Sequence, residues 1–539
     1  MSTVAEAGSR KGLPALSSTL KYLIRVVLLG IVDVFALLLA IAIGNDGNWF
    51  LAIAIILTTV IVNIINLVPN LWPMRWMSPA IALLILVAFY PLLYTVYVSF
   101  TNYSDGHRYT KTEALDLIAD RKFLPEGVVN YSWVPFRNEA GDYALWLTDQ
   151  EGNTFLTAPG QDLQEVTPNE SGSGPYDDNG VPTTIDGYTL LTGGDRFKAL
   201  AELQEMEFGT SENPIGILNR SEAGNFQQRW VFDEERNVLT DKQAGIEYKA
   251  NDDTGEFVAA DGSRAPIGYW VVIGFDNFEE IFSSSLTEGP LLRVFLWTIG
   301  YAFGGVLTSF AMGLFMAIML DVKWRGIRVV RSLLLIPWAI PGMISILIWR
   351  GMLQGASQIT EVSGIIPKTL DDLFGWTPAF FTDPTWAKVA ILLVNLWFAY
   401  PYFMLISSGA MQSIPSSIYE AARVDGASSW RQFRDLTLPL ILVSLGPLLI
   451  ASFIFNFNNY LLLEALNGGG PPMKGANVPP VGHTDNLITY TYRYAFASGG
   501  TRDFGLASAI AVVIFFIVAL LTLAQFRLTR RWEEIGENV

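Results

Sequence analysis

Long runs of apolar residues constrain the fold of this chain more than any other feature of its sequence. Only 16% of its 539 residues are charged, whereas soluble proteins usually carry about a quarter. A helix needs about 20 apolar residues to cross a bilayer. Eight segments meet this requirement: 24–43, 49–68, 79–101, 291–320, 329–350, 387–410, 438–462 and 505–526. The sequence therefore predicts an all-α polytopic membrane protein with eight transmembrane helices.

Basic residues indicate the orientation of these spans, because lysine and arginine mark the cytoplasmic side of a membrane. They gather in both terminal segments and in every second connection, for example at Lys323–Arg331 and Arg423–Arg434. The other connections carry few basic residues. We therefore expect both termini in the cytoplasm and the long connection after the third span outside it.

That long connection, residues 102–286, has the pattern of a folded acidic domain. Residues 101–290 hold 34 acidic and 13 basic residues. Short apolar and aromatic runs such as 143–147 and 269–275 alternate with Gly/Asp turn signals, a pattern typical of strands. We expect a β-rich extracytoplasmic insert with one helix at Phe197–Glu207 and a loop at 171–180.

Composition excludes several kinds of chemistry. The chain has no cysteine and only two histidines, which excludes disulfides, thiolate sites and cysteine nucleophiles and argues against a multi-histidine metal site. No clustered basic face suggests nucleic acid, and no G-x-x-x-x-G-K-[ST] motif could hold ATP. We therefore expect no metal, no cofactor and no ATP hydrolysis on this chain. Two other classes are alternatives: an ion-coupled secondary transporter, and a membrane-anchored enzyme with its chemistry in the insert.

A polar segment between the sixth and seventh spans predicts a two-helix hairpin on the cytoplasmic side. Its central part, residues 420–439, has the sequence EAARVDGASSWRQFRDLTLP. Ser417 and Glu420 have capping-box spacing, as do Ser429 and Gln432, and Gly426 is a natural C-cap. Local capping and helix propensity could explain these residues, but such a compact polar feature also suits docking to a soluble partner.

Polar and aromatic residues inside the sixth and seventh spans form two candidate stripes. Ser452, Asn456 and Asn459 have i, i+4, i+7 spacing, and Asn395 lies seven residues before Tyr402. Polar groups inside a membrane are costly and often functional, although single amides commonly only join helices. Five such positions without a charged side chain favour a path for a neutral solute. Asp33, alone in the first span, is interpreted as a helix contact.

Several of these segments resemble one family of transport proteins. The string E-A-A, then glycine six residues after Glu420, then L-P, is similar to the EAA loop of ABC importer permease subunits. The segments 274–282 and 331–350 resemble sugar permeases of that family, and 453–472, 484–496 and 502–511 resemble its maltose/maltodextrin permeases. The resemblance is strong over about 290–530 and weakest inside the insert.

The resemblance implies a type I ABC importer permease fold with a β-rich insert. It divides the chain into 1–101 with spans one to three, the insert 102–286, and a permease core 287–539 with spans four to eight. It implies that residues 412–437 are the EAA coupling loop, whose contacts to an ATPase would be Glu420, Ala421, Ala422, Asp425 and Gly426. It implies sugar contacts at Asn395, Phe398, Ala399, Tyr402, Ser452, Phe455, Asn456 and Asn459. Phe398 and Ala399 depart from the leucine and glycine expected there.

The function that follows is import of maltose, maltodextrin or a related α-glucoside, and another neutral oligosaccharide such as trehalose is the alternative. The implied partners are a second permease subunit, two copies of a cytoplasmic ATPase that hold ATP and Mg²⁺, and an extracytoplasmic sugar-binding protein. The implied location is a bacterial cytoplasmic (inner) membrane.

Overall fold

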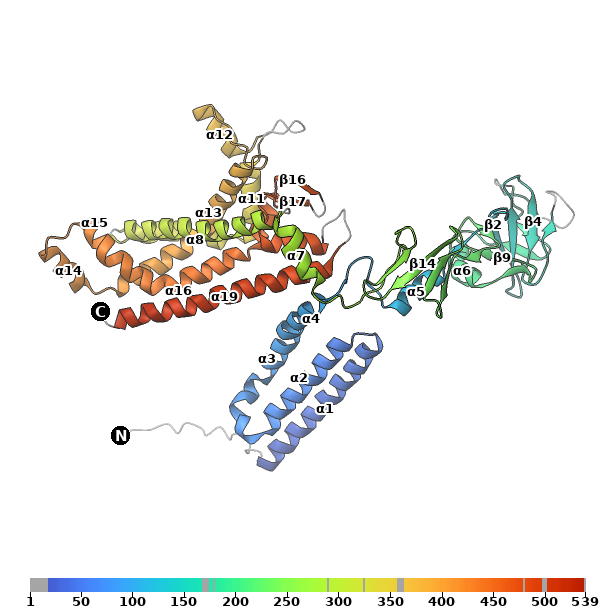
Figure 1. The fold of residues 1–539 in the computed structure, drawn as a ribbon, viewed down its shortest axis with the longest axis horizontal. Coiled ribbons are helices and arrows are strands. Elements are labelled where there is room, and N and C mark those ends of the chain that lie inside the picture. The colour runs from blue at the N-terminus through green and yellow to red at the C-terminus, as the bar shows by residue number, and fades with distance from the viewer. Residues whose placement is uncertain are drawn as a thin grey trace, which may run out of the picture. The chain divides into compact units, whose positions relative to one another are not determined.

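The computed structural model describes residues 18–166, 174–177, 180–287, 290–322, 325–355, 363–477, 480–496 and 502–537. The chain divides into two compact units (Figure 1). One comprises Met1–Thr101 and Gly274–Val539, and the other comprises Asn102–Ile273. The second unit ends before the boundary expected at 286, because helix α7 (Asp276–Thr287) packs on helices of the first unit.

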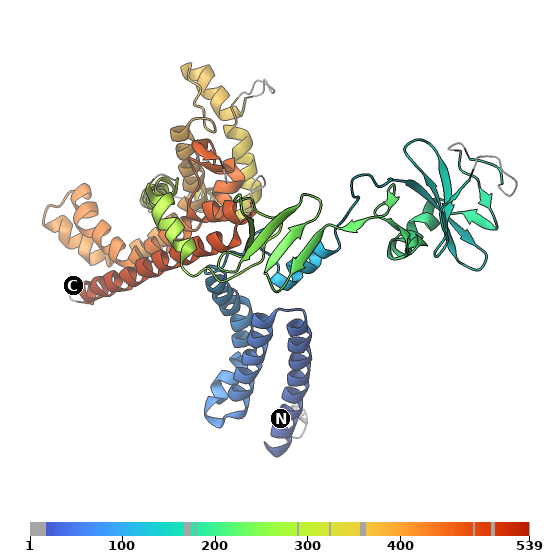
Figure 2. The same ribbon diagram turned by 45° about the vertical axis from the view of Figure 1, so that its right-hand side comes forward.

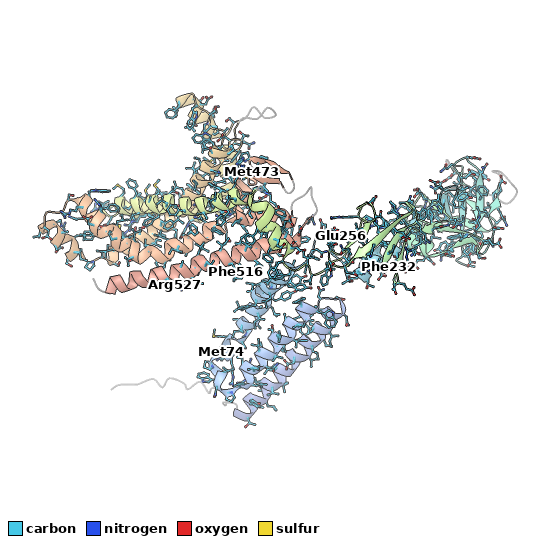
Figure 3. The ribbon with its side chains drawn as sticks, viewed as in Figure 1. Met74, Phe232, Glu256, Met473, Phe516 and Arg527 are labelled. Atoms are coloured by element: carbon cyan, nitrogen blue, oxygen red, sulfur yellow. The ribbon has the colours of Figure 1, made fainter. Side chains whose placement is uncertain are left out.

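The first unit, here called the membrane unit, is helical. Seven of its described helical segments are long and apolar enough to cross a membrane. They are α1 (Ser18–Asn45), α2 (Trp49–Leu67), the run η1–α3–η2–α4 (Pro69–Met77, Ser78–Leu84, Ile85–Phe89, Tyr90–Val98), α8 (Leu291–Met319), α13 (Pro384–Ser413), the run α15–η3–α16 (Ser429–Gln432, Phe433–Thr437, Leu438–Phe457) and α19 (Phe504–Glu537). Phe516 and Arg527 mark the course of α19 in Figure 3.

The fifth expected span, 329–350, is interrupted. It consists of α9 (Ile327–Leu334), α10 (Ile336–Ala339) and α11 (Gly342–Leu353). Ile340 is extended, with φ −93° and ψ 131°, immediately before Pro341. Proline lacks an amide donor and disfavours the helical conformation in the residue before it, so Pro341 accounts for the break. The described part of the chain therefore holds seven spans of sufficient length and one interrupted span where eight were expected.

The seventh expected span, 438–462, is also broken near its end. Helix α16 ends at Phe457, and α17 (Tyr460–Asn467) starts anew with Asn459 as its N-cap. Asn486, fully buried before α18 (Leu487–Phe496), donates from Nδ2 to the carbonyls of Asn459 at 3.1 Å and Phe457 at 3.4 Å. These bonds satisfy backbone groups freed by the break, as an apolar surrounding requires.

Helices α8 and α13 pack side by side along the middle of the membrane unit. Gly313 makes their close approach possible, because a Cβ there would lie 2.5 Å from the Cβ of Phe403. Small residues at such crossings are the usual means of close helix packing in membranes.

Helices α1 and α2 are joined by a hydrogen bond between side chains. Asn63 Nδ2 donates to Asp33 Oδ1 at 2.7 Å, which confirms Asp33 as a helix contact. Apart from the helix of the polar segment 412–437, described below, the remaining elements of this unit are α12 (Ile365–Phe374), β16 (Pro472–Asn477) and β17 (Pro480–Gly482).

The second unit is the β-rich insert that the turn pattern predicted. A six-stranded antiparallel sheet has the order β5-β4-β3-β2-β7-β6 and a four-stranded one the order β12-β13-β14-β15. Figure 2 shows the strands of this unit from a second side. The strands are β1 (Lys122–Phe123), β2 (Ser132–Asn138), β3 (Tyr143–Thr148), β4 (Thr154–Thr157), β5 (Gln164–Glu165), β6 (Thr184–Ile185), β7 (Tyr188–Leu190), β8 (Phe208–Thr210), β9 (Asn213–Ile217), β10 (Ala223–Gly224), β11 (Gln227–Gln228), β12 (Trp230–Asp233), β13 (Val238–Asp241), β14 (Ile246–Asn251) and β15 (Glu256–Ala259).

Two helices accompany these sheets. Helix α6 (Gly193–Glu205) overlaps the expected helix at 197–207 but begins earlier, and α5 (Lys111–Ala119) was not predicted. Thr110 and Glu113 form a complete capping box at the start of α5, so the signal for that helix was present in the sequence. Half of the loop expected at 171–180, residues 171–173 and 178–179, lies outside the described residues.

The polar segment 412–437 forms the expected hairpin, here called the coupling hairpin. Helix α14 (Ser416–Val424) has Asp425 as its C-cap, and Gly426 follows at φ +78°. Ala427 N donates to Ala422 O at 2.9 Å. Gly426 therefore stops α14 as predicted, but from the position after the C-cap. Both predicted N-caps were wrong by one or two residues: Pro415 precedes α14 without a side-chain cap, and Ser428 caps α15.

Candidate functional site

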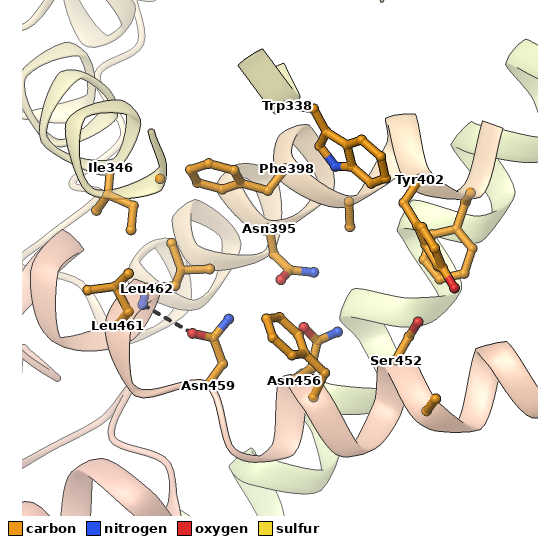
Figure 4. A pocket seen from close by; sticks show the side chains of 15 residues that line it. Trp338, Ile346, Asn395, Phe398, Tyr402, Ser452, Asn456, Asn459, Leu461 and Leu462 are labelled. Atoms are coloured by element: carbon orange, nitrogen blue, oxygen red, sulfur yellow. Dashed lines mark hydrogen bonds between the residues drawn. The ribbon is translucent and has the colours of Figure 1, made fainter. Parts of the chain in front are cut away.

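All eight residues expected to contact a sugar line one cavity of the membrane unit. Its volume is about 540 Å³, within the range typical of small-molecule sites. The full lining consists of Trp338, Gly342, Ile346, Asn395, Phe398, Ala399, Tyr402, Phe403, Ala451, Ser452, Phe455, Asn456, Asn459, Leu461 and Leu462. None of these side chains is charged. Helix α13 supplies one wall and α16 with the start of α17 supplies the other (Figure 4).

The broken fifth span supplies a wall that the stripes did not predict. Trp338, from α10, stacks against Tyr402, with ring centroids 6.0 Å apart and planes 28° from parallel. Gly342 and Ile346, from α11, line the cavity beside it. Pro337 and Pro341 stand four residues apart within an otherwise apolar span, and such a pair indicates a discontinuous helix. This pair of prolines could have indicated from the sequence that Trp338, which lies between them, stands beside a helix break.

Asn459 lies in the cavity for a different reason from the one its spacing suggested. The stripe argument assumed an unbroken helix from Ser452 through Asn459. Because α16 ends at Phe457, Asn459 instead occupies the break, where its Oδ1 accepts from Leu462 N at 3.2 Å. The dashed line in Figure 4 marks this bond. Ser452 and Asn456 do share one face of α16 as expected.

Tyr301, on α8, connects two of the cavity amides and was missed at the sequence level. It is completely buried. Its hydroxyl donates to Asn395 Oδ1 and accepts from Asn459 Nδ2, each at 3.2 Å. A single tyrosine within a span rich in aromatic residues carries little signal, since its partners lie 94 and 158 residues away.

Gly305, one turn further along α8, leaves room for the cavity amides. A Cβ at this position would lie 2.7 Å from Asn395 Nδ2 and 3.0 Å from Asn456 Nδ2. Asn395 and Asn456 are 3% and 5% exposed. Figure 4 shows Asn395 facing Asn456 and Asn459 across the cavity.

An ion cluster supports the segments that follow the α16–α17 break. Arg493 on α18 donates to Asp485 Oδ1 at 3.1 Å and to Glu464 Oε2 at 2.8 Å. Burial by itself lowers the pKa of Arg493, but the Asp485 and Glu464 carboxylates more than offset this, so its pKa is raised. The guanidinium therefore stays charged, and it fixes α18 to the end of α17.

The five expected coupling residues gather at the tip of the coupling hairpin. Glu420, Ala421, Asp425 and Gly426 are exposed, and Ala422 is half-buried. Glu420 forms no hydrogen bond or ion pair with the residues that the structure describes. Nearby, Val424 and Trp430 are 88% and 69% exposed. The predicted capping role of Glu420 is thus wrong, and its carboxylate faces solvent.

A grouping of three or more His, Cys, Asp or Glu side chains suited to a metal is not found in the described ranges. The cavity lining itself offers hydrogen bonding by amides and hydroxyls beside aromatic faces. These groups suit a polar, uncharged molecule better than an ion.

Two family models and a solved transporter are similar to parts of this chain. Residues 309–534 match the family described as "Binding-protein-dependent transport system inner membrane component". Residues 82–159 match "N-terminal of TM subunit in PBP-dependent ABC transporters". A solved bacterial ABC transporter that imports the acidic polysaccharide alginate is 22% identical, with a TM-score of 0.40 over 48% of this chain and 84% of that one.

Longer matches identify the particular family. The maltose/maltodextrin transport system permease protein MalF of Klebsiella aerogenes is 34% identical, over 85% of this chain and 87% of its own. MalF of Escherichia coli K12 is 33% identical with the same coverage. The chain belongs to the MalF family of ABC importer permeases. It is thus a multi-pass protein of the inner membrane, and the expected fold class is confirmed.

Proposed function

We propose that this chain is the permease subunit through which an ATP-driven importer moves maltose, maltodextrin or a related α-glucoside into the cytoplasm. The cavity carries this proposal. Its fifteen lining residues combine three amides, two hydroxyls and several aromatic rings without a charge. Amides and hydroxyls hydrogen-bond sugar hydroxyls, while aromatic rings cover the apolar faces of sugars. A site for an acidic sugar would need basic side chains, because a buried anion without a partner is costly.

The coupling hairpin supports the proposal that the energy for transport comes from other subunits. The sequence carries no phosphate-binding loop, and exposed Glu420, Val424 and Trp430 offer a carboxylate and apolar area to another protein. We propose that two ATPase subunits, which would hold ATP and Mg²⁺, bind this hairpin and its counterpart, and that no cofactor or enzymatic activity belongs to this chain. A second permease subunit would supply that counterpart and complete the path.

The charge pattern supports an orientation with both termini and the coupling hairpin in the cytoplasm. The acidic insert would then face outward, where a sugar-binding protein delivers the substrate. Relatives of this chain are named as maltose/maltodextrin permeases, which favours that sugar class over trehalose.

Reconstitution of the complete assembly tests the proposal. Proteoliposomes with the sugar-binding protein outside and ATP enclosed should accumulate labelled maltose, whereas vesicles without enclosed ATP should not. An acidic oligosaccharide of similar length should not be transported. Uptake that persists without the ATPase, on a proton or sodium gradient, would overturn the proposal.

A further inference from the structure

Three basic side chains meet beside Trp297 in the membrane unit, outside the candidate sugar cavity. Arg293 lies in the first turn of α8, four residues before Trp297 and so on the same side of that helix. Lys388, in the second turn of α13, places its Nζ 5.0 Å from the centroid of the Trp297 ring. His483 follows β17, and the charges of Lys388 and Arg293 both act on its ring. We call Arg293, Lys388 and His483 the basic cluster.

Trp297 joins the elements that carry the basic cluster. Its Nε1 donates to Thr484 O at 3.1 Å, which ties α8 to the residue directly after His483. Its ring faces the Lys388 ammonium, a favourable cation–π contact. The His483 backbone is held as well, because its N donates to Pro471 O at 2.8 Å. The fold of the chain therefore sets the backbone positions around the cluster.

The basic cluster is not neutralised by the acidic side chains that the structure describes. The chain carries 51 acidic residues against 35 basic ones, yet none of the ion pairs among described residues involves Arg293, Lys388 or His483. Arg493, on α18, pairs with two carboxylates. Burial, followed by the charges of Lys388 and Arg293, lowers the pKa of His483. An anion beside the cluster would relieve this repulsion.

The lengths of α8 and α13 indicate the depth of the cluster in a membrane. The helices have 29 and 30 residues, so each is about 44 Å long, whereas the hydrocarbon core of a bilayer is about 30 Å thick. With the excess shared by both ends, about the first five residues of each helix lie in the headgroup layer. Arg293 is the third residue of α8 and Lys388 the fifth of α13. Lipid phosphates lie at this depth, where tryptophan is also enriched.

Beyond the cluster, both helices present apolar side chains. Leu296 follows Arg293 by three residues and is exposed, as is Phe303 two turns further along α8. Val389, next to Lys388 on α13, is exposed too. A phospholipid would bring a phosphate to the cations and acyl chains to these side chains, whereas a soluble anion would leave the apolar surface uncovered. A zwitterionic headgroup would also bring an ammonium group, which the cluster repels.

We propose that the basic cluster binds the phosphate of one anionic phospholipid. The phosphate lies between Arg293 and Lys388, His483 donates to it when protonated, and an acyl chain covers Leu296. The lipid thereby joins α8, α13 and the segment after β17. This inference goes beyond the proposed function, because it depends neither on the sugar carried nor on ATP. With both termini in the cytoplasm, the lipid belongs to the outer leaflet.

Lipid binding to the complete assembly tests this inference. The assembly, freed of lipid in detergent, is titrated with dioleoylphosphatidylglycerol, and native mass spectrometry counts the bound lipids. Lys388→Gln and Arg293→Gln should each weaken the binding of one phosphatidylglycerol about fivefold, the effect of one cation at an anionic lipid surface. The double variant should weaken it by about twenty-five-fold. Binding of dioleoylphosphatidylcholine should be the same in all four proteins.

Two further variants separate charge from packing. Lys368→Gln is the matched control, because Lys368 is an exposed lysine on α12 that lies outside the basic cluster. It should bind phosphatidylglycerol as the wild type does. Lys388→Arg keeps the charge and should also retain the lipid. Loss of the lipid in Lys388→Arg to the same extent as in Lys388→Gln would show that packing against Trp297, and not charge, is responsible, and would contradict the proposal.

A measurement on the wild type stands by itself if the variants fail to assemble. Phosphatidylglycerol with a photoreactive group near the glycerol end of an acyl chain should label the segments that contain Leu296 and Val389. Labelling that spares both segments would overturn the proposal.

The remaining outcomes distinguish other ligands. Displacement of the lipid by inorganic phosphate at equal concentration would indicate a site for soluble anions. Variants that keep the lipid but lose affinity for the sugar-binding protein would indicate a protein-docking surface. Equal losses of phosphatidylglycerol and phosphatidylcholine would indicate a disturbed fold. Each of these results would refute the lipid site and leave the proposed transport function untouched.

Discussion

The cavity and the coupling hairpin use polar groups in opposite ways. At the cavity, Asn459 is hydrogen-bonded to Tyr301 of the same chain, and Asn395 Nδ2 is buried without a partner among the described residues. On the hairpin, Glu420 is exposed and forms no bond with described residues, and Trp430 is 69% exposed. A site for a small ligand must be organised before the ligand arrives, whereas a docking surface gains its contacts from the partner.

The largest effect is expected at the hairpin. Glu420→Lys should lower ATP-dependent sugar uptake about tenfold or more, because charge reversal at a docking contact adds repulsion to the lost attraction. The amount of this chain inserted in the membrane should not change, since exposed Glu420 supports nothing in its own fold. Uptake in reconstituted vesicles and co-purification of the ATPase measure the two effects.

Glu234→Lys provides the control for charge reversal at an exposed glutamate. Glu234 lies in the turn between β12 and β13 of the insert and is also exposed. This variant should co-purify with as much ATPase as the wild type does. Equal recovery of the ATPase with the wild type and with Glu420→Lys would contradict the proposal that the hairpin binds the ATPase.

The next effect is expected inside the cavity. Gly305→Ala places a Cβ 2.7 Å from Asn395 Nδ2, so the amide must shift. Uptake should fall roughly fivefold to tenfold, because a catalytic or binding group loses much of its effect when displaced by about 1 Å. Gly300→Ala on the same helix is the matched control, since nothing lies within 4 Å of its added Cβ. The two variants should differ clearly in uptake and little in yield.

These two regions also differ in how far the sequence predicted them. The hairpin depends on local signals, and Gly426 at φ +78° and the positions of α14 and α15 followed from them. Its exact N-caps did not, because Ser417 and Ser428–Ser429 offer several nearly equivalent starts. The β-rich insert was predicted from turns, but the pairing of strands such as β2 with β7 depends on contacts far apart in sequence.

The cavity residues were predicted by side-chain type, while the reason for their positions was not. The stripes assumed continuous helices, yet Asn459 reaches the cavity through a break that Asn486 stabilises from 27 residues away. Trp338 lies on α10 and Tyr301 lies on α8, and neither helix was part of the predicted stripes. Periodicity describes one helix at a time, so it cannot show which side chain of a neighbouring helix completes a site.

A pair of phenylalanines on α16 separates ligand contact from packing. Phe455 lines the cavity and is 71% exposed, whereas Phe457 is 1% exposed. Phe455→Ala should reduce sugar uptake roughly threefold to fivefold and change the unfolding free energy by about 0.5 kcal/mol or less. Phe457→Ala should destabilise the chain by about 3–5 kcal/mol, because it leaves a cavity in the packed core. Thermal unfolding in detergent and uptake in vesicles distinguish the two. Similar stability losses in both variants would contradict a ligand-facing role for Phe455.

The smallest effect is expected at the joint between the hairpin and the seventh span. The hydroxyls of Tyr419 on α14 and Thr437 in the π-helical turn η3 lie 3.0 Å apart, and Thr437 is buried. This bond ties the hairpin to the base of α16. Tyr419→Phe should therefore lower the number of sugar molecules imported per ATP hydrolysed by about twofold, the size of one modest hydrogen bond. ATPase association should persist, because the exposed hairpin tip is unchanged. Thr437→Val removes this bond and also the bond from Thr437 Oγ1 to Gln432 O at 3.3 Å, so it should lower the ratio at least as much. Adding Tyr419→Phe to Thr437→Val should change nothing further, since the shared bond is already lost. An additive double variant would show that the two hydroxyls act separately, and the hairpin would then reach the cavity by another route.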